Sequence, residues 1–280
     1  WYYKVSDLHN YAELAAACAF FENKFGKIGG LDSLTEYWLE TESRLRTDFN
    51  IPGIKTDTIA RIKRKSLMKE VFERAGIPFA PGAIVKHAPQ AHEFTRTHGF
   101  PVVIKPDAGV GAAYTYKINS HGEIDGFFSS KPDRDFIIEK YIEGNIVTFD
   151  GITDAGGNIV FCTSHFCYPP PMEALLKDSD IYYYSYREIP SDIEQTGRKL
   201  VAEFDVRQRF FHFEFFRKED GSLIACEVNI RPPGGMTVDM FNYACDIDMY
   251  NLWARIITEE NVRLNYTRKY HSCFISRKHT

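Results

Sequence analysis

The strongest constraint on the fold is a polar strand near the C-terminus, which reads Leu223-Ile-Ala-Cys-Glu-Val-Asn-Ile-Arg-Pro-Pro-Gly-Gly235. Side chains alternate along a strand, so Glu227, Asn229 and Arg231 are expected on one face. Glu214 lies on the preceding strand of a hairpin, and pairing would bring its carboxylate near that of Glu227. Neighbouring carboxylates repel unless a cation lies between them, and oxygen donors beside a guanidinium suit Mg²⁺ and phosphate. An exposed polar face with a surface ion pair is the alternative, with equal weight.

A second candidate site begins at the buried strand segment Val103-Ile104-Lys105-Pro106, which a turn of small residues follows at 107–113. A lysine that ends a buried strand costs free energy unless it meets an anion. The backbone N–H groups of a glycine-rich turn can surround phosphate oxygens. The turn is neither a Walker A loop nor the dinucleotide GxGxxG pattern. Taken alone, it fits a tight turn between two strands better than a phosphate site.

Two weaker signals lie on either side of this strand. Lys65 lies on a helix that Gly76-Ile-Pro78 ends, and on its own it is a solvated helix lysine. An apolar strand leaves its layer at Glu139, and the free backbone groups of residues 140–142 then follow. A carboxylate and a backbone N–H can read the edge of an adenine. Alone, this segment is a strand connection that ends in a glycine turn.

These four segments, in this order and at these separations, resemble the ATP-grasp superfamily over roughly residues 55–260. The resemblance implies an α/β (α+β) fold in which two α+β lobes grip ATP, preceded by the remnant of a Rossmann-like pre-ATP-grasp domain. The implied boundaries are 1–56 for the C-terminal part of that preceding domain, 57–142 for the small lobe and 143–280 for the large lobe with its metal-binding strands. Within the superfamily, residues 229–236 resemble the carboxylate–amine (L-amino acid) ligase branch.

The resemblance also implies roles for individual residues. Arg231 and Lys105 are the expected catalytic residues, and Glu214, Glu227 and Asn229 are expected to hold one or two Mg²⁺ (or Mn²⁺) ions. Phosphate-binding lysines, a lid, an adenine-binding hinge with two packing residues, and a ribose contact make up the expected ATP site. In chain order these are Lys65, Val103, Lys105, Gly109, Gly111, Ala112, Ala113, Tyr114, Glu139, Lys140, Tyr141, Ile142, Asp150 and Phe216.

The implied activity is the phosphorylation of a carboxylate by ATP, followed by attack of an amine on the acyl phosphate. The expected partners are therefore ATP and small-molecule carboxylate and amine substrates, and a homodimer is compatible with the resemblance. Substrate choice is expected in residues 164–186, where His165, Arg187 and the tyrosines could bind a carboxylate or an aromatic group. The alternatives are a purine-biosynthetic, carbamoyl phosphate synthase-like or biotin carboxylase-like enzyme, and a non-catalytic ATP-binding module.

Composition narrows the remaining classes of partner. The net charge is −4, and lysine and arginine are dispersed along the 280 residues, so a nucleic-acid partner is not expected. No apolar run reaches the ~18 to 20 residues of a membrane span, so a membrane partner is not expected either. The six cysteines form no CxxC pair, which favours reduced thiols in a cytoplasmic protein.

The pattern of apolar residues and turn signals predicts a strand over residues 1–5 and two hairpins, with turns at 154–157 and 219–221. Residues 168–186, rich in proline and tyrosine, are expected to be irregular. Helices are expected over 11–25, 33–48, 57–75, 91–98, 191–204 and 246–257.

Overall fold

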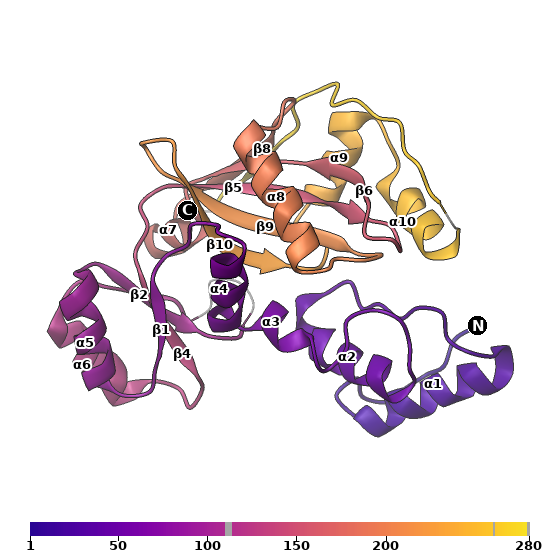
Figure 1. Cartoon of the computed structure of the whole chain (residues 1–280), viewed down its shortest axis with the longest axis horizontal. Coiled ribbons are helices and arrows are strands. Elements are labelled where there is room, and N and C mark those ends of the chain that lie inside the picture. The colour runs from indigo at the N-terminus through magenta and orange to yellow at the C-terminus, as the bar shows by residue number, and fades with distance from the viewer. Residues whose placement is uncertain (110–113, 260, 279–280) are drawn as a thin grey trace. The chain divides into compact units, whose positions relative to one another are not determined.

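The computed structural model describes residues 1–109, 114–259 and 261–278 and divides the chain into two compact units, residues 1–60 and 61–280 (Figure 1). The first unit contains α1 (Tyr11–Phe25), the 3₁₀ helix η1 (Glu36–Trp38) and α2 (Leu39–Asp48). Asn10 caps α1, because its side chain accepts from the backbone N–H groups of the first turn. The strand predicted over residues 1–5 is wrong, since no described strand pairs with this segment. That the first unit is the C-terminal part of a preceding α/β domain stays a prediction.

Within the second unit, the predicted helix over 57–75 is divided in two, α3 (Ile59–Lys63) and α4 (Lys65–Arg74). Arg64 between them is extended, with φ −97° and ψ 119°. Asp107 causes the break, because its carboxylate accepts from the Ser66 N–H at 2.8 Å and its carbonyl accepts from the Lys65 N–H at 2.9 Å. A residue of the predicted phosphate loop therefore starts the helix that carries Lys65.

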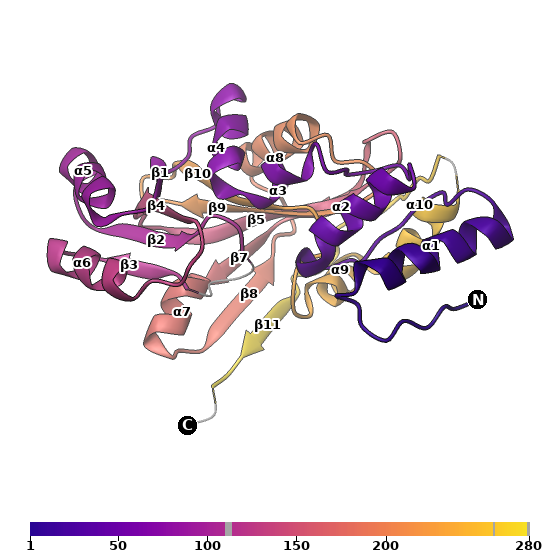
Figure 2. The same cartoon turned by 90° about the horizontal axis from the view of Figure 1, so that it is seen from below.

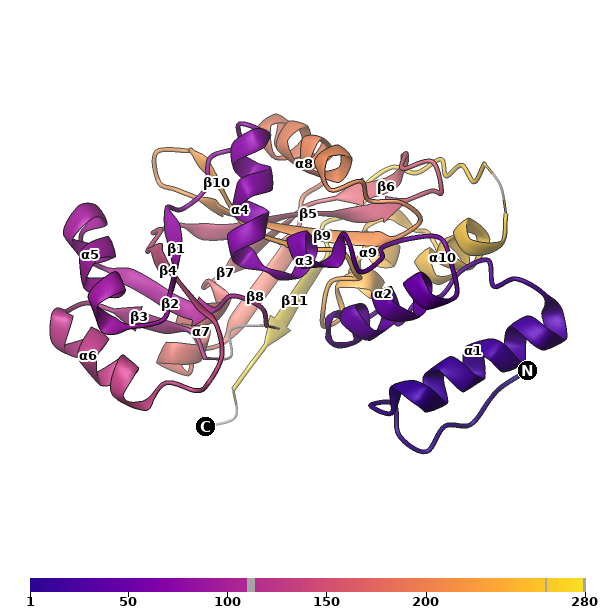
Figure 3. The same ribbon diagram turned by 60° about the horizontal axis from the view of Figure 1, so that its bottom comes forward.

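A four-stranded antiparallel sheet follows, in the order β1-β4-β2-β3. Its strands are β1 (Gly82–Val85), β2 (Val102–Pro106), β3 (Tyr116–Ile118) and β4 (Phe136–Lys140). Two helices, α5 (Ala88–His98) and α6 (His121–Ser130), lie beside each other on one face of this sheet (Figure 3). Phe94, Phe127 and Phe136 are buried between the helices and the sheet, so the opposite face is left for the site.

The larger sheet has the order β10-β9-β5-β7-β8-β11, and β6 pairs with β5. Both predicted hairpins are confirmed, as β5–β6 and β9–β10. Thr148 pairs with Glu214, and Glu214 pairs with Glu227, so one face of three neighbouring strands is polar. The strands are β5 (Asn145–Thr153), β6 (Ile159–Thr163), β7 (His165–Tyr168), β8 (Ile181–Ser185), β9 (Phe210–Arg217), β10 (Leu223–Asn229) and β11 (Cys273–Ser276).

Helices cover both faces of the larger sheet, with α8 (Ser191–Glu203) on one side and α9 (Thr237–Cys245) on the other (Figure 2). Together with α10 (Met249–Thr258), α9 packs on Ile152, Phe161 and Phe210 beyond the polar part of the sheet. The segment predicted to be irregular contains α7 (Pro171–Lys177) and β8. The prolines of this segment do not prevent the helix, because a proline is tolerated in the first turn, where its missing N–H has no partner to lose. None of the described helices is long and apolar enough to span a bilayer.

We expect Gly151→Ala to destabilise the second unit. Gly151 lies in β5 where a Cβ would meet the Phe161 carbonyl oxygen and the Phe211 ring, and neither backbone nor buried ring can move freely. Overpacking of this kind typically lowers the free energy of unfolding by about 1–3 kcal/mol. Urea unfolding followed by circular dichroism measures the change.

Gly126→Ala is the matched control, because a Cβ at Gly126 in α6 meets no atom within 4 Å. Alanine favours a helix over glycine by roughly 1 kcal/mol, so this variant should be as stable as the parent or more stable. Equal unfolding free energies for Gly151→Ala and the parent protein would contradict the packing described for β5.

Candidate active site

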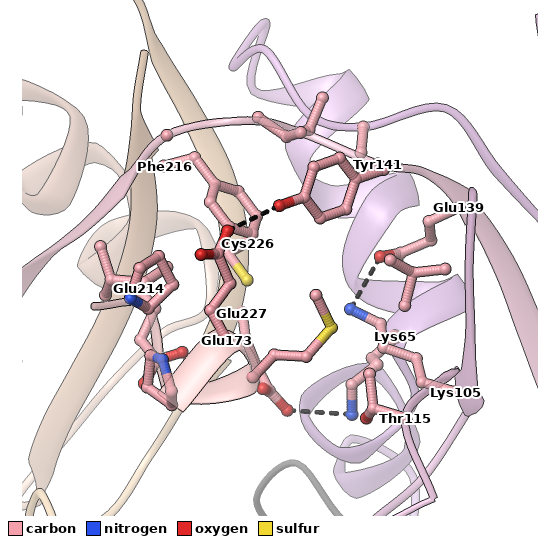
Figure 4. Close-up of a pocket in the computed structure, with 18 of the residues that line it drawn as sticks. Lys65, Lys105, Thr115, Glu139, Tyr141, Glu173, Glu214, Phe216, Cys226 and Glu227 are labelled. Atoms are coloured by element: carbon pink, nitrogen blue, oxygen red, sulfur yellow. Dashed lines mark hydrogen bonds and ion pairs between the residues drawn. The ribbon is translucent and has the colours of Figure 1, made fainter. Parts of the chain in front are cut away.

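A cavity of about 180 Å³ lies between the four-stranded sheet and strands β9 and β10 (Figure 4). Figure 4 shows Lys65 and Lys105 on the opposite side of this cavity from Glu214 and Phe216. We call it the first cavity. Most of the residues predicted from the sequence line it, namely Lys65, Val103, Lys105, Gly109, Glu139, Lys140, Tyr141, Ile142, Glu214, Phe216, Glu227, Asn229 and Arg231.

The pairing of β9 with β10 sets the acidic wall of the first cavity. Glu227 lies directly opposite Glu214, and a bulge between Ala225 and Glu227 follows from the shift in register. The extra residue is Cys226, so two consecutive residues, Cys226 and Glu227, both line the cavity. Strict alternation would have put Cys226 on the other face, which is why the sequence did not reveal it.

Two carboxylates and the Asn229 amide are oxygen donors that suit Mg²⁺ or Mn²⁺ when nucleotide oxygens complete the coordination. Among the described residues, no three His, Cys, Asp or Glu side chains form a metal cage by themselves. The Lys65 Nζ lies 3.0 Å from Glu227 Oε1. This buried lysine therefore offsets the charge of the Glu227 carboxylate in the structure.

A buried ion-pair network forms the basic wall of the cavity. Glu139 Oε2 lies 2.7 Å from the Lys105 Nζ, and Glu139 Oε1 lies 2.9 Å from the Lys69 Nζ. Burial alone would raise the pKa of Glu139, but the charges of Lys105 and Lys69 outweigh burial and lower this pKa to about 2. Burial alone would lower the pKa of Lys105, and Glu139 instead holds it above its usual range. Lys105 is therefore a fixed, charged ammonium group.

This network gives Glu139 a role that was not expected. Its carboxylate was predicted to accept from an adenine amine, which stays a prediction, and in the structure its two oxygens are paired with lysines. The side chain thereby positions Lys105. Lys69 was missed because nothing in the sequence connects it to Glu139, which lies 70 residues away, although its i+4 spacing from Lys65 puts both lysines on one face of α4.

The hinge after β4 offers fewer free backbone groups than expected. The Lys140 N–H donates to the Pro81 carbonyl at 2.9 Å, and the Tyr141 N–H donates to the Pro101 carbonyl at 3.2 Å. The Lys140 ammonium donates to the Phe100 carbonyl at 3.0 Å, so it too is engaged with the backbone, although Lys140 lines the cavity. Within the described residues, no partner is found for the N–H of Ile142, so it is the hinge N–H that can meet a ligand.

Helix α7 contributes to the first cavity, although this helix was not predicted. Met172 and Glu173 line the cavity, and the Tyr141 hydroxyl donates to Glu173 Oε1 at 2.8 Å. Burial raises the pKa of Tyr141 to about 12, and Glu173 adds to the shift. The Lys117 ammonium lies 3.7 Å from the centroid of the same ring. The hinge and α7 are therefore joined across the cavity.

Some predicted residues lie elsewhere. Tyr114 is exposed, with the Arg134 guanidinium 4.5 Å from its ring centroid, and it does not line the cavity. Gly111, Ala112 and Ala113 lie outside the described residues.

Asp150 is the clearest correction. It does not line the first cavity but a second cavity, of about 320 Å³, that shares Glu214 with it. Its oxygens accept from His165 Nδ1 at 2.8 Å and from His212 Nδ1 at 2.6 Å. Burial alone would lower the pKa of His212, but Asp150 raises it to about 10. Asp150 is fully buried, engaged by two imidazoles and absent from the lining of the first cavity, so it is not placed to contact a ribose there.

Comparison with known proteins agrees with this geometry. The model of the ATP-grasp domain family matches residues 98–239. An L-arginine-specific L-amino acid ligase of Bacillus subtilis is 24% identical over 253 residues, which cover 86% of this chain and 61% of the relative.

Two solved structures are similar. An L-amino acid ligase from Bacillus licheniformis has a TM-score of 0.71 at 15% identity and covers 89% of this chain and 61% of its own. The second is the biotin carboxylase domain of Hydrogenobacter thermophilus 2-oxoglutarate carboxylase, solved with MgADP and bicarbonate. Its TM-score is 0.68 at 22% identity, and the match covers 93% of this chain and 60% of that domain's chain. This chain spans about three fifths of the length of these relatives. The matched model covers half of the chain, and the predicted fold is confirmed: the chain belongs to the ATP-grasp family.

Proposed function

We propose that this chain is the ATP-binding core of a ligase that phosphorylates a carboxylate and couples the acyl phosphate to an amine, with release of ADP and phosphate. The arrangement of charge in the first cavity carries the proposal. Lys65, which is buried, and Lys105, whose side chain is 13% exposed, face two carboxylates and the Arg231 guanidinium across a cavity that both sheets line. A polyphosphate with a divalent cation is complementary to that pattern.

The nucleotide would lie with its adenine at the hinge. Val103 and Phe216 line the cavity and offer apolar surfaces to the two faces of a purine, and the Ile142 N–H is available to a ring nitrogen. The triphosphate would extend to Lys65 and Lys105, whose ammonium groups are held by Glu227 and Glu139. Held donors of this kind are already oriented before the nucleotide arrives.

Glu214, Glu227 and Asn229 would hold one or two Mg²⁺ or Mn²⁺ ions. A bound cation would neutralise phosphate charge there. The Arg231 guanidinium donates to the Pro232 carbonyl at 2.8 Å and reaches Asn229 Oδ1 at 3.4 Å. It is therefore oriented beside the metal donors, where it would stabilise the negative charge of the transferred phosphoryl group.

The Bacillus relatives support an amino-acid carboxylate as the phosphoryl acceptor, since one is named as specific for L-arginine and both as L-amino acid ligases. The neighbour solved with bicarbonate supports the competing class, in which bicarbonate accepts the phosphoryl group. ADP release that requires an acid and an amine together would distinguish the amide-forming class from the bicarbonate-using class.

We expect Mg²⁺-dependent ADP release by the full-length protein to require both an amino acid and an amine acceptor. Glu227→Gln should lower kcat at least ~100-fold, because it replaces a charged metal donor by a neutral amide and removes the anion that holds Lys65. A coupled pyruvate kinase assay measures ADP. ADP release that bicarbonate alone stimulates would refute the amide-forming assignment.

The matched control for that variant is Glu219→Gln, at the exposed turn of the same β9–β10 hairpin. Its ADP release should equal that of the parent. A comparable loss in the control would mean that Glu227→Gln acts through the hairpin fold.

We expect Lys69→Met to weaken nucleotide binding by roughly tenfold, although Lys69 does not line the cavity. Among the described residues, the substitution leaves Glu139 with Lys105 as its one ion-pair partner, so the Lys105 ammonium can shift toward Glu139 and away from the phosphates. Titration with a fluorescent ATP analogue measures the dissociation constant.

Lys199→Met, on the exposed side of α8, is the control for Lys69→Met and should leave the dissociation constant unchanged. If Lys69→Met lowers the unfolding temperature but binds ATP normally, Lys69 supports the fold and does not position Lys105.

A further inference from the structure

The second cavity has a polar end beside the proposed metal site. Ile146, Pro171 and Glu214 line both cavities, so the second one opens where the phosphoryl group would be transferred. At this end Asp150 is fully buried and accepts from His165, His212 and the Thr148 hydroxyl, the last at 2.5 Å.

The other carboxylate of the second cavity is also engaged. Glu214 Oε1 lies 3.0 Å from His212 Nε2, and the same imidazole binds Asp150 through Nδ1. His212 therefore bridges the cavity's two acids. Among the described residues that line this cavity, Asp150 and Glu214 are the acidic ones, and neither is without a basic partner.

The opposite end of the cavity is mainly apolar and is formed by β8 and β11. Tyr183 pairs with Phe274, and Ile181 pairs with Ser276, so these four side chains share the face that lines the cavity. The Tyr183 and Phe274 rings lie 5.0 Å apart between centroids. Ile275 alternates to the other face of β11, where it is 63% exposed.

These two ends discriminate between kinds of side group. A cationic group that entered from the Glu214 side would lose part of its hydration to the half-buried Ile181, Tyr183 and Phe274, in a cavity whose two acids already have basic partners. Burying an unpaired charge is unfavourable, and removing Asp150 from its histidines would break a buried ion pair. An apolar or aromatic group would instead pack against these rings.

We propose that the second cavity binds the side group of the carboxylate substrate and selects an apolar or aromatic group over a cationic one. The inference rests on the proposed ligase function. The substrate's carboxylate would lie at the shared Glu214 mouth, beside the phosphates, with its side group directed toward β8 and β11. The chain's preference would then differ from the arginine specificity named for its Bacillus subtilis relative.

The test replaces the amine by hydroxylamine, so that hydroxamate formation depends on the acid alone. The full-length protein, MgATP and hydroxylamine are combined with L-phenylalanine, L-leucine, L-arginine or L-lysine. We expect kcat/KM for phenylalanine and leucine to exceed that for arginine and lysine at least ~tenfold. Equal or greater turnover of the cationic acids overturns the inference and leaves the ligase proposal intact. No hydroxamate and no ADP with any acid overturns the ligase proposal, and this inference with it.

A variant that adds a carboxylate to the apolar end tests the cavity directly. Ile181→Glu should raise the ratio of arginine to phenylalanine turnover at least ~tenfold, because a guanidinium would gain an ion-pair partner. Ile275→Glu is the matched control, since it adds the same group to the outward face of the paired strand. Its ratio should not change.

Unfolding temperature and ATP affinity are measured for each variant. If Ile181→Glu is unfolded, Ser276→Glu adds the carboxylate directly opposite, at an exposed position on the same face. A folded, ATP-binding variant from this pair that keeps the parent's ratio shows that the second cavity does not choose the substrate.

Discussion

The pairing of β9 with β10 places Glu214 directly opposite Glu227, and this register of two acids on neighbouring strands determines the rest of the site. Two carboxylates this close are unfavourable in water-poor surroundings unless cations surround them. The protein supplies those cations from several elements. Lys65 comes from the start of α4 and pairs with Glu227, and His212, two residues before Glu214 on β9, pairs with Glu214. The elements around the sheet therefore place basic side chains next to the two carboxylates of β9 and β10.

On the other side of the first cavity the signs of charge are reversed. There the excess charge is positive, and Glu139 holds Lys69 and Lys105 together. On each side, a group of opposite charge holds the others in place: His212 beside the carboxylates, and Glu139 beside the lysines. A ligand that carries both signs, as a metal–polyphosphate does, can replace part of these internal pairs with its own, so the charged groups need little reorganisation on binding.

The sequence predicted the parts of this site that depend on residues close together in the chain, and missed the parts that depend on contacts between distant segments. Alternation along one strand was enough to place Glu227, Asn229 and Arg231 together, because that pattern is local. Cys226 was missed because a bulge is a property of two paired strands, and Lys69 because its partner comes from β4. The ribose role given to Asp150 failed for a similar reason, since His165 and His212 reach it from β7 and β9.

Asp107 connects three segments that lie far apart in the sequence. Its carboxylate holds Ser66 at the start of α4, its carbonyl accepts from Lys65, and its own N–H donates to the Asp135 carbonyl just before β4. It directly follows β2, the strand that ends in Lys105-Pro106. One buried residue thus fixes the backbone positions of both Lys65 and Lys105 relative to each other. A ligand whose anionic groups match that spacing can meet both ammonium groups with little movement of the backbone.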